Sequence, residues 1–187
     1  MQDRLRKHFE EIIRLSDGEF ELVLSHFKPK KAKKHEFLIE EGKRVEFVFF
    51  VVSGLVKLTY TDDSGRESIV SFAMEDWWES DYQAFYSRHP ASMSLQCLEN
   101  TEVYCLSLEN YRNLCKELHK MEHFFLEKAN RGHIASQQRI ISFLTLSAKE
   151  RYGLLLKRYP SLLQRVSKTL LASYLGVSRE TLSRLSS

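Results

Sequence analysis

The stretch that most restricts the fold of this chain is VSKTLLASYLGVSRETLSRL, residues 166–185, close to the C-terminus. Its apolar residues recur at helix spacing on either side of a break at Gly176 and Ser178, which predicts two short helices joined by a tight turn. Ala172 is small enough for two crossing helices to approach closely, and Gly176 can adopt the positive φ that the turn needs. Ser178 then caps the second helix. We therefore expect a helix-turn-helix of the kind that binds DNA.

The second helix carries Arg179, Glu180, Ser183 and Arg184 off its apolar side. Glu180 and Arg184 are also i,i+4 partners, which could form an ordinary solvated helix face. Arg179 does not fit that interpretation, because a cation in the first turn opposes the helix dipole at a cost of about 0.3–1 kcal/mol. A residue that breaks a local rule without structural gain indicates a functional position.

The charge of the chain is unevenly distributed. The net charge of the 187 residues is only +3, yet residues 146–187 hold eight lysines and arginines against two glutamates. The C-terminal segment therefore carries +6 and the remainder −3. A basic segment on a slightly acidic chain is typical of a module that binds a polyanion.

Several features predict a cytoplasmic protein with no membrane partner. The N-terminal MQDRLRKHFEEII mixes acids and bases in a helical pattern, which is not that of a signal peptide. The longest apolar run, residues 47–52, is too short to cross a bilayer. Cys97, Cys105 and Cys115 are odd in number and form no CxxC pair, which is typical of a reducing compartment.

The secondary structure that the sequence predicts changes along the chain. Residues 4–27 are predicted to be helical, with Ser16–Glu19 opening a second helix as a capping box. The basic run KPKKAKK, residues 28–34, is either a nucleic-acid patch or the solvated face beside a strand. Short β-rich runs follow between turn signals, and the predicted strands are 37–39, 47–52, 55–60, 68–72, 92–98 and 101–107. This spacing indicates a jelly roll or barrel, whose interior can hold a small ligand.

Helical patterns return at residues 108–118 and 120–144. The longer segment carries an apolar-to-small stripe, formed by Met121, Phe124, Phe125, Ala129, Gly132, Ser136, Ile140, Ile141 and Leu144. Such a stripe could pack on its own chain, but small residues also let two helices approach closely. We expect a homodimer interface made by Met121, Phe125, Ala129, Gly132, Ser136 and Ile140. A capping box at Ser147–Glu150 opens a further helix, which ends at Pro160.

The order of a β-roll, a long helix and a helix-turn-helix resembles the Crp/Fnr family of bacterial transcription regulators. The matching pieces beside the C-terminal motif are FLIEEG at 37–42, VVSGLVK at 51–57, DSGRE at 63–67, and Arg151-Tyr152 ahead of Tyr159-Pro160. The resemblance implies an α+β fold with three parts: a cyclic nucleotide-binding-like β-roll (jelly-roll) domain at 1–118, a dimerisation helix at 119–145, and a helix-turn-helix domain at 146–187. The family usually continues into a β-hairpin wing, and we expect most of that wing to be lacking.

The resemblance also implies roles for the C-terminal residues. Arg179, Glu180 and Arg184 fall where the family reads bases, and this fits their chemistry: arginine can pair with guanine O6 and N7, and glutamate can accept from cytosine N4. Thr169 and Ser178 become candidates for phosphate contacts, with Ser183 on the same surface. The implied partners are double-stranded DNA with an inverted repeat, a second copy of the chain, RNA polymerase and an unidentified small-molecule effector.

Cyclic AMP is not expected to be that effector. Family members that bind it hold its phosphate and ribose with a Gly-Glu-Leu and an Arg-Ser/Thr-Ala segment, and we align the glutamate with Ser80 and the arginine with Ala91. Arg88 lies near enough that an insertion could disguise the arginine. The aromatic cluster Trp77, Trp78, Tyr82, Phe85 and Tyr86 either fills a core or lines a pocket for a flat ligand. The candidate effector pocket is formed by Trp77, Trp78, Tyr82, Arg88 and Ser92.

No catalytic residue, metal or cofactor is expected. The family's iron–sulfur cluster needs four cysteines and this chain has three, so another residue would have to supply a ligand. His119 and His123 are i,i+4 on a helix, a pair that is more often solvated than ligating. A cupin-like metalloenzyme is an alternative that a jelly roll allows, but the predicted strands offer only His35 and His89. A ligand-binding module that acts through protein contacts is the third interpretation.

Overall fold

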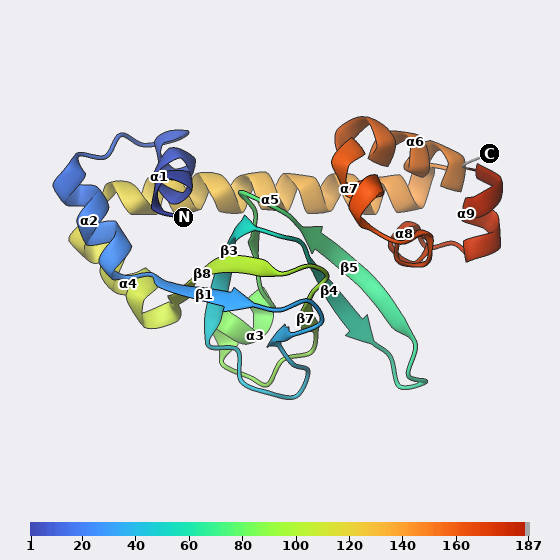
Figure 1. The fold of residues 1–187 in the computed structure, drawn as a ribbon, viewed down its shortest axis with the longest axis horizontal. Coiled ribbons are helices and arrows are strands. Elements are labelled where there is room, and N and C mark those ends of the chain that lie inside the picture. Colours follow the sequence, from blue (N-terminus) through green and yellow to red (C-terminus); the bar gives the residue numbers. More distant parts are fainter. Residues whose placement is uncertain (186–187) are drawn as a thin grey trace. The chain divides into compact units, whose positions relative to one another are not determined.

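The structure is a computed structural model that describes residues 1–185 (Figure 1). These residues form two compact units. The first contains residues 1–60 and 71–128, and the second contains residues 61–70 together with the described residues from 129 onward. No helix among the described residues is long and apolar enough to span a membrane.

The first unit begins with two helices, α1 (Gln2–Glu10) and α2 (Asp17–Ser25). The predicted capping box at the start of α2 is confirmed: the backbone N–H of Glu19 donates to Ser16 Oγ at 3.3 Å, and that of Ser16 donates to the Glu19 carboxylate at 2.8 Å. Leu5, Phe9 and Val23 are fully buried, so both helices add to the core of this unit.

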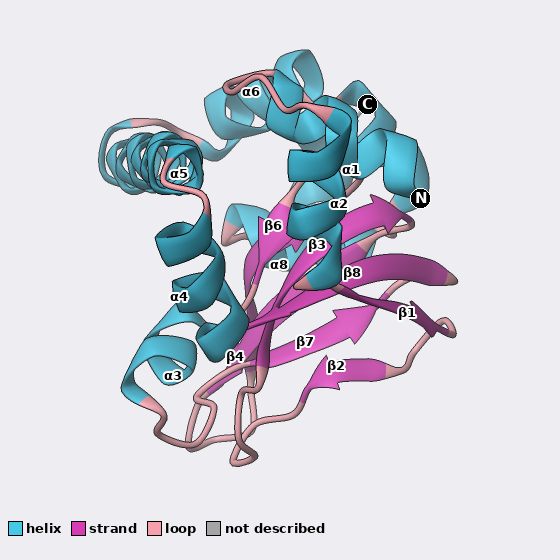
Figure 2. Ribbon diagram, turned by 90° about the vertical axis from the view of Figure 1, so that its left-hand side faces the viewer, coloured by secondary structure: helices cyan, strands magenta, loops and turns pink. Residues whose placement is uncertain are grey.

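Two four-stranded sheets build the β-roll (Figure 2). The strands are β1 (Lys28–Ala32), β2 (Phe37–Ile39), β3 (Phe47–Ser53), β4 (Val56–Thr61), β5 (Glu67–Ala73), β6 (Trp78–Glu79), β7 (Ser94–Cys97) and β8 (Thr101–Ser107). One sheet has the order β1-β8-β3-β6 and the other β2-β7-β4-β5. Strands distant in sequence are therefore neighbours, as in a jelly roll, and buried side chains of β3, β4, β7 and β8 form one hydrophobic cluster.

The basic run after α2 is itself a strand, which the sequence analysis did not predict. β1 pairs with β8 from Lys28 opposite Cys105 to Ala32 opposite Thr101. β1 lies at the edge of its sheet, where lysine and proline are common because they discourage pairing with other chains. Lys31 forms an ion pair with Glu102 at 2.6 Å, so the solvated-face interpretation fits this run.

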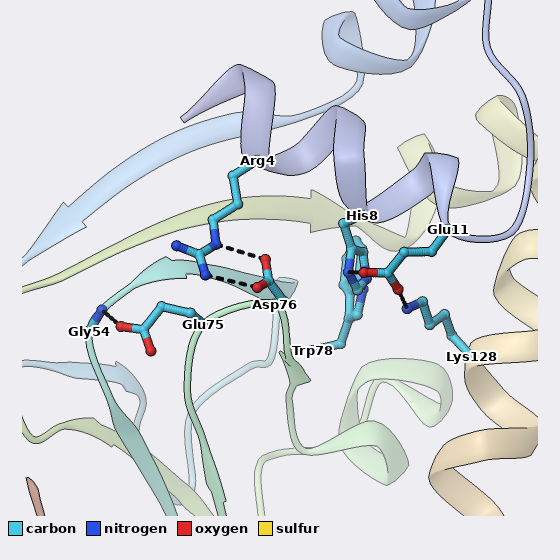
Figure 3. Close-up of polar contacts among 8 residues, drawn as sticks. All are labelled: Arg4, His8, Glu11, Gly54, Glu75, Asp76, Trp78 and Lys128. Carbon is cyan, nitrogen blue, oxygen red and sulfur yellow. Dashed lines mark hydrogen bonds and ion pairs between the residues drawn. The ribbon is translucent and has the colours of Figure 1, made fainter. Parts of the chain in front are cut away.

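The turn between β3 and β4 requires glycine at position 54. Gly54 has φ +103°, and a Cβ at this position would lie 2.5 Å from Thr101 Oγ1 and 2.8 Å from the Asn100 carbonyl oxygen. Its backbone N–H donates to the Glu75 carboxylate at 2.8 Å (Figure 3). The requirement for glycine in the VVSGLVK segment is therefore explained by local steric contacts.

Polar contacts tie α1 to the segment before β6 (Figure 3). The Arg4 guanidinium donates to both carboxylate oxygens of Asp76, at 2.7 and 2.8 Å. Trp78 Nε1 donates to Nε2 of the buried His8 at 3.0 Å. These contacts fix one helix of the first unit against its sheet.

Helix α3 (Tyr82–Ser87) lies between β6 and β7 in the chain. Helices α4 (Leu108–Glu117) and α5 (Lys120–Thr145) follow β8. α5 has 26 residues and matches the predicted long helix. Met121 and Phe124 in its first turns are fully buried in the core of the first unit.

The second unit contains α6 (Ala148–Arg158), α7 (Pro160–Arg165), α8 (Lys168–Leu175) and α9 (Arg179–Leu185) (Figure 1). Pro160 does end the preceding helix, as predicted, but it also begins the unpredicted α7, because the first helical position does not need an N–H. The core of the four helices is formed by Leu155, Leu162, Val166, Leu171, Ala172, Leu175 and Leu182. The region after α9, where a wing would begin, lies outside the described residues.

Candidate DNA-binding surface and effector region

The predicted helix-turn-helix is formed by α8 and α9. The N-cap of α8 is Ser167, whose Oγ accepts from the backbone of Leu170 at 3.4 Å. α8 ends at Gly176 with φ 69° and ψ 34°, the left-handed conformation that the sequence predicts. The backbone N–H of Val177 donates back to the Ala172 carbonyl at 3.0 Å, which closes the turn.

The exposed side of α9 carries the predicted base-reading residues. Leu182 is 1% exposed and holds the helix to its unit, while Arg179, Glu180, Ser183 and Arg184 are exposed. Ser178 caps the helix as predicted, because its Oγ accepts from the backbone of Thr181 at 3.1 Å.

Glu180 and Arg184 form no ion pair in the described chain, so the i,i+4 interpretation of these residues gains no support. Hydrogen bonds from its own backbone and from Ser178 lower the pKa of Glu180, and the charges of Arg179 and Arg184 lower it further. The carboxylate is therefore an ionised acceptor between two cations. Thr169, the other predicted phosphate contact, is exposed in the first turn of α8.

The structure places the five residues predicted to line an effector pocket in different surroundings. Trp78 belongs to the aromatic core, with its ring centroid 5.2 Å from that of Phe50 and 6.0 Å from those of Phe27 and Phe125. Trp77 is half-buried against the same core. The core-filling interpretation of the tryptophans therefore fits better than the pocket.

The other three members differ from the tryptophans in their contacts. Tyr82 on α3 is exposed. Arg88 ends α3 in a left-handed conformation and lines a pocket of about 260 Å³ with Arg44 and Lys28. Ser92 is turned toward Asp81 instead, as its hydrogen bonds demonstrate.

Asp81 is the residue of this region that sequence reasoning missed. Its carboxylate is fully buried. One oxygen accepts from the backbone of Ala84 at 3.0 Å, and the other accepts from the backbone N–H of Ser92 at 2.9 Å and from its hydroxyl at 3.1 Å. The N-cap position of α3 was the available signal, since aspartate is common there. The Ser92 donors that follow Ala91 are thus already occupied by the side chain of Asp81.

The two positions aligned with the nucleotide-binding arginine and glutamate are buried. Ala91 is 4% exposed, and its N–H and C=O pair with the backbone of Lys43 and Gly42, each at 2.8 Å. Ser80 is 1% exposed and its hydroxyl donates to the Phe47 carbonyl at 3.0 Å. Neither residue offers a charged group to a ligand.

The predicted dimer stripe of α5 divides into buried and exposed residues. Met121 is fully buried, and Phe125 packs on Tyr111 with ring centroids 4.5 Å apart. Met121 therefore belongs to the core of its own chain, which corrects the interface expected for it, while Phe125 is partly buried against the same core. Ala129, Gly132, Ser136 and Ile140 are exposed. The large apolar side chains that α5 exposes are Leu126, Ile134, Ile140, Ile141, Phe143 and Leu144.

Comparisons of the sequence with known proteins agree over most of the chain. Residues 29–118 match the cyclic nucleotide-binding domain family. The chain is 26% identical over 164 residues to the transcriptional activator protein Anr of Pseudomonas protegens, covering 82% of this chain and 66% of that protein. It is 22% identical over 180 residues to the cAMP-activated global transcriptional regulator CRP of Escherichia coli, covering 91% of this chain and 86% of CRP. The β-roll region is thus a cyclic nucleotide-binding domain, and the chain as a whole is similar to Crp/Fnr-type transcription regulators.

Solved structures of such regulators have the same fold as this chain. FixK2 from Bradyrhizobium japonicum superposes with a TM-score of 0.74 at 17% identity, covering 85% of this chain and 82% of FixK2. CLP from Xanthomonas campestris, described as a c-di-GMP responsive global regulator, gives 0.71 at 19% identity, covering 91% of this chain and 89% of CLP. The predicted fold class, with a β-roll, a long helix and C-terminal helices, is confirmed.

The three cysteines of the chain are buried free thiols. Burial raises the pKa of Cys105 and of Cys115 to about 11, so both thiols are protonated at neutral pH. His119 is exposed and contacts Glu122 at 3.3 Å. Within residues 1–185, no three His, Cys, Asp or Glu side chains come together in a group that could hold a metal ion.

Proposed function

We propose that this chain is a sequence-specific DNA-binding transcription regulator that acts by binding rather than by catalysis. The observation that carries the proposal is the α9 surface, where buried Leu182 leaves Arg179, Glu180 and Arg184 exposed together at the end of a basic segment. Anr and CRP, which are named as transcription regulators, match 82% and 91% of the chain. Such a regulator would work in the cytoplasm and act through RNA polymerase.

Base reading is assigned to α9 by its chemistry. Each arginine can donate two hydrogen bonds to one guanine, and the ionised Glu180 can accept from cytosine N4. Thr169 and Ser178 stand at the exposed N-terminal ends of α8 and α9, where contacts to phosphate would set the position of the protein on DNA. Ser183 follows on the exposed side of α9.

A second copy of the chain is the proposed partner of α5. Ile134, Ile140, Ile141 and Leu144 are between 51% and 78% exposed, which is unusual for so many large apolar residues on one helix. Ala129, Gly132 and Ser136 would let the two helices approach closely. The proposed division is a β-roll domain at 1–118, a dimerisation helix at 119–145 and a DNA-binding domain at 146–187.

The β-roll is proposed to work without cyclic AMP. A cyclic phosphate carries a full negative charge and needs donors or a cation when it leaves water. In this chain the Ser92 donors already serve the Asp81 carboxylate, and Ala91 supplies no guanidinium. An effector of other chemistry remains compatible with the fold, because CLP is described as responsive to c-di-GMP.

Selection of binding sites from a pool of random DNA tests the proposed function. A dimer with α9 as its reading helix should recover an inverted repeat whose half-site centres lie about one helical turn, roughly 34 Å, apart. Selection should succeed with no nucleotide added. Recovery of sequences without two-fold symmetry, or of no enriched sequence, would contradict the proposal.

A further inference from the structure

Two arginines hold the C-terminal end of α8, the helix that precedes the recognition helix. Nη2 of Arg139, on α5, donates to the carbonyl oxygen of Tyr174 at 3.1 Å. Nε and Nη2 of Arg151, on α6, donate to the carbonyl oxygen of Leu175 at 3.3 and 3.0 Å. The last carbonyls of a helix have no partner within the helix and carry its negative dipole end, so guanidinium groups stabilise this position.

Both guanidinium groups also contact one aromatic ring. The guanidinium carbons of Arg139 and Arg151 each lie 4.9 Å from the centroid of Phe143. Arg139 is closer still to Tyr174, at 3.8 Å from its ring centroid. A Cβ on Gly176 would lie 3.0 Å from the Phe143 ring, so the turn into α9 packs directly on this group. The planar guanidinium suits such stacking, and a lysine would not reproduce it.

Arg139 also reaches strand β5 of the β4–β5 hairpin. Nη2 of Arg139 donates to the Ile69 carbonyl at 3.3 Å, in addition to its bond to Tyr174. Ile69 is 5% exposed and lies in the hairpin segment 61–70, which forms one compact unit with α6–α9. One side chain therefore bonds the hairpin and the helix-turn-helix at the same time.

We infer that Arg139 is a positioning residue that sets the orientation of α8 and α9 from the β4–β5 hairpin, and so determines operator affinity without touching DNA bases. The inference rests on the proposed function of the chain. A change in the position of the hairpin is then transmitted to α9 through the Arg139 guanidinium.

The electrostatics of the group support a positioning role over simple charge pairing. No carboxylate forms an ion pair with Arg139 or Arg151 in the described residues. Burial is the main cause that lowers the pKa of Arg139, and the charge of Arg151 lowers it further. Keeping two cations close together without an acidic partner costs free energy. Charge pairing therefore does not explain why both guanidinium groups contact the end of α8 and the Phe143 ring.

The test compares Arg139→Lys and Arg139→Gln with the matched control Arg131→Gln. Arg131 is an exposed arginine on the same helix, so its replacement removes the same charge as Arg139→Gln. Affinity is measured by fluorescence anisotropy on a selected operator and on random DNA, and circular dichroism confirms that each variant folds. Both Arg139 variants should lose about ten-fold on the operator and much less on random DNA, although lysine keeps the charge.

A result in which Arg139→Lys retains full operator affinity, or in which Arg131→Gln loses as much as Arg139→Gln, would overturn the inference. Failure of the wild-type chain to discriminate the operator from random DNA would instead count against the proposed function. The two failures are thus distinguishable in one set of titrations.

A second variant tests the route through the hairpin. Gly65, at the hairpin turn, has φ +82°, so Gly65→Val strains the turn without removing a contact of the helix-turn-helix. Gly65→Val should lower operator affinity in the wild-type background and have little further effect in the Arg139→Gln background. Equal effects in both backgrounds would show that the hairpin does not act through Arg139.

Discussion

At the scale of single residues, the buried Glu79 of the β-roll makes the stability of the first unit depend on pH. Burial raises the pKa of Glu79 to about 7, and the hydrogen bonds from Ser71 and from the backbone of Ser80 oppose this only in part. In the unfolded chain the same carboxyl ionises near pH 4.5. The folded state therefore binds more protons between these two values, and the free energy of unfolding falls as the pH rises through this window.

Replacing Glu79 with glutamine should remove this pH dependence. The amide cannot ionise, so the variant should lose the part of the pH dependence that Glu79 causes. Between pH 4 and pH 8, the wild type should lose about 3 kcal/mol of unfolding free energy that the variant keeps. Urea denaturation at several pH values provides the measurement. The exposed Glu46→Gln serves as control and should keep the wild-type slope. A wild-type slope in Glu79→Gln would show that Glu79 is not the responsible group.

Asp81 gives a second prediction at this scale. Because its carboxylate occupies the Ser92 donors and no arginine stands at position 91, isothermal calorimetry should detect no cyclic AMP binding in the micromolar range. DNA binding should be the same with and without the nucleotide. Micromolar binding of cyclic AMP would mean that the segment 80–92 is aligned wrongly, and Arg88 would then be the first residue to replace.

At the scale of elements, the requirement for glycine at the β3–β4 turn can be tested directly. Gly54→Ala should lower the free energy of unfolding by about 2–3 kcal/mol, since the new Cβ would clash with Thr101 and with the Asn100 carbonyl. Gly153→Ala in α6 is the matched control: it meets open space and should be neutral or stabilising by up to about 1 kcal/mol. Equal effects of both substitutions on thermal unfolding would refute the steric cause.

The sequence predicted those elements whose pattern is local. The strand at 101–107, the long helix and both helices of the helix-turn-helix agree with the structure to within a few residues. The elements that were missed depend on tertiary contacts instead. β1 is a lysine-rich edge strand with no alternating apolar face, and β6 has two residues that form a strand only because β3 pairs with them.

The residues of the candidate site divide in the same way: those set by a local pattern could be predicted, and those set by tertiary contacts could not. The exposure of Arg179, Glu180 and Arg184 could be predicted from helix periodicity, because the neighbouring Leu182 fixes which side of α9 is buried. The effector residues could not, since periodicity does not tell which aromatic side chains pack on α1. Trp78 is inside because His8 and Phe50, distant in sequence, lie against it.

At the scale of the whole molecule, the proposed homodimer depends on the exposed residues of α5. Ile140→Asp should give monomers, because the dimer would bury an unpaired carboxylate. Phe125→Asp is a less direct test, since Phe125 is partly buried against the core of its own chain and a carboxylate there would also destabilise the fold. Leu156→Asp on α6 replaces a similarly exposed apolar residue outside α5 and is the control.

Sedimentation velocity distinguishes the outcomes for the dimer. The wild type and Leu156→Asp should sediment as dimers and Ile140→Asp as a folded monomer with much weaker operator binding, since one copy reads only one half-site. A dimer that is unaltered by Ile140→Asp would place the interface on another surface.

The most direct measurement of the central claim is the DNA affinity of Arg184→Ala on two kinds of DNA. If Arg184 reads a base, the substitution should cost about 1–3 kcal/mol on the selected operator and much less on random DNA. Lys157→Ala, which removes the same charge from an exposed position on α6, should weaken both slightly and equally. Equal losses on operator and random DNA for Arg184→Ala would contradict the account of α9 as the reading helix.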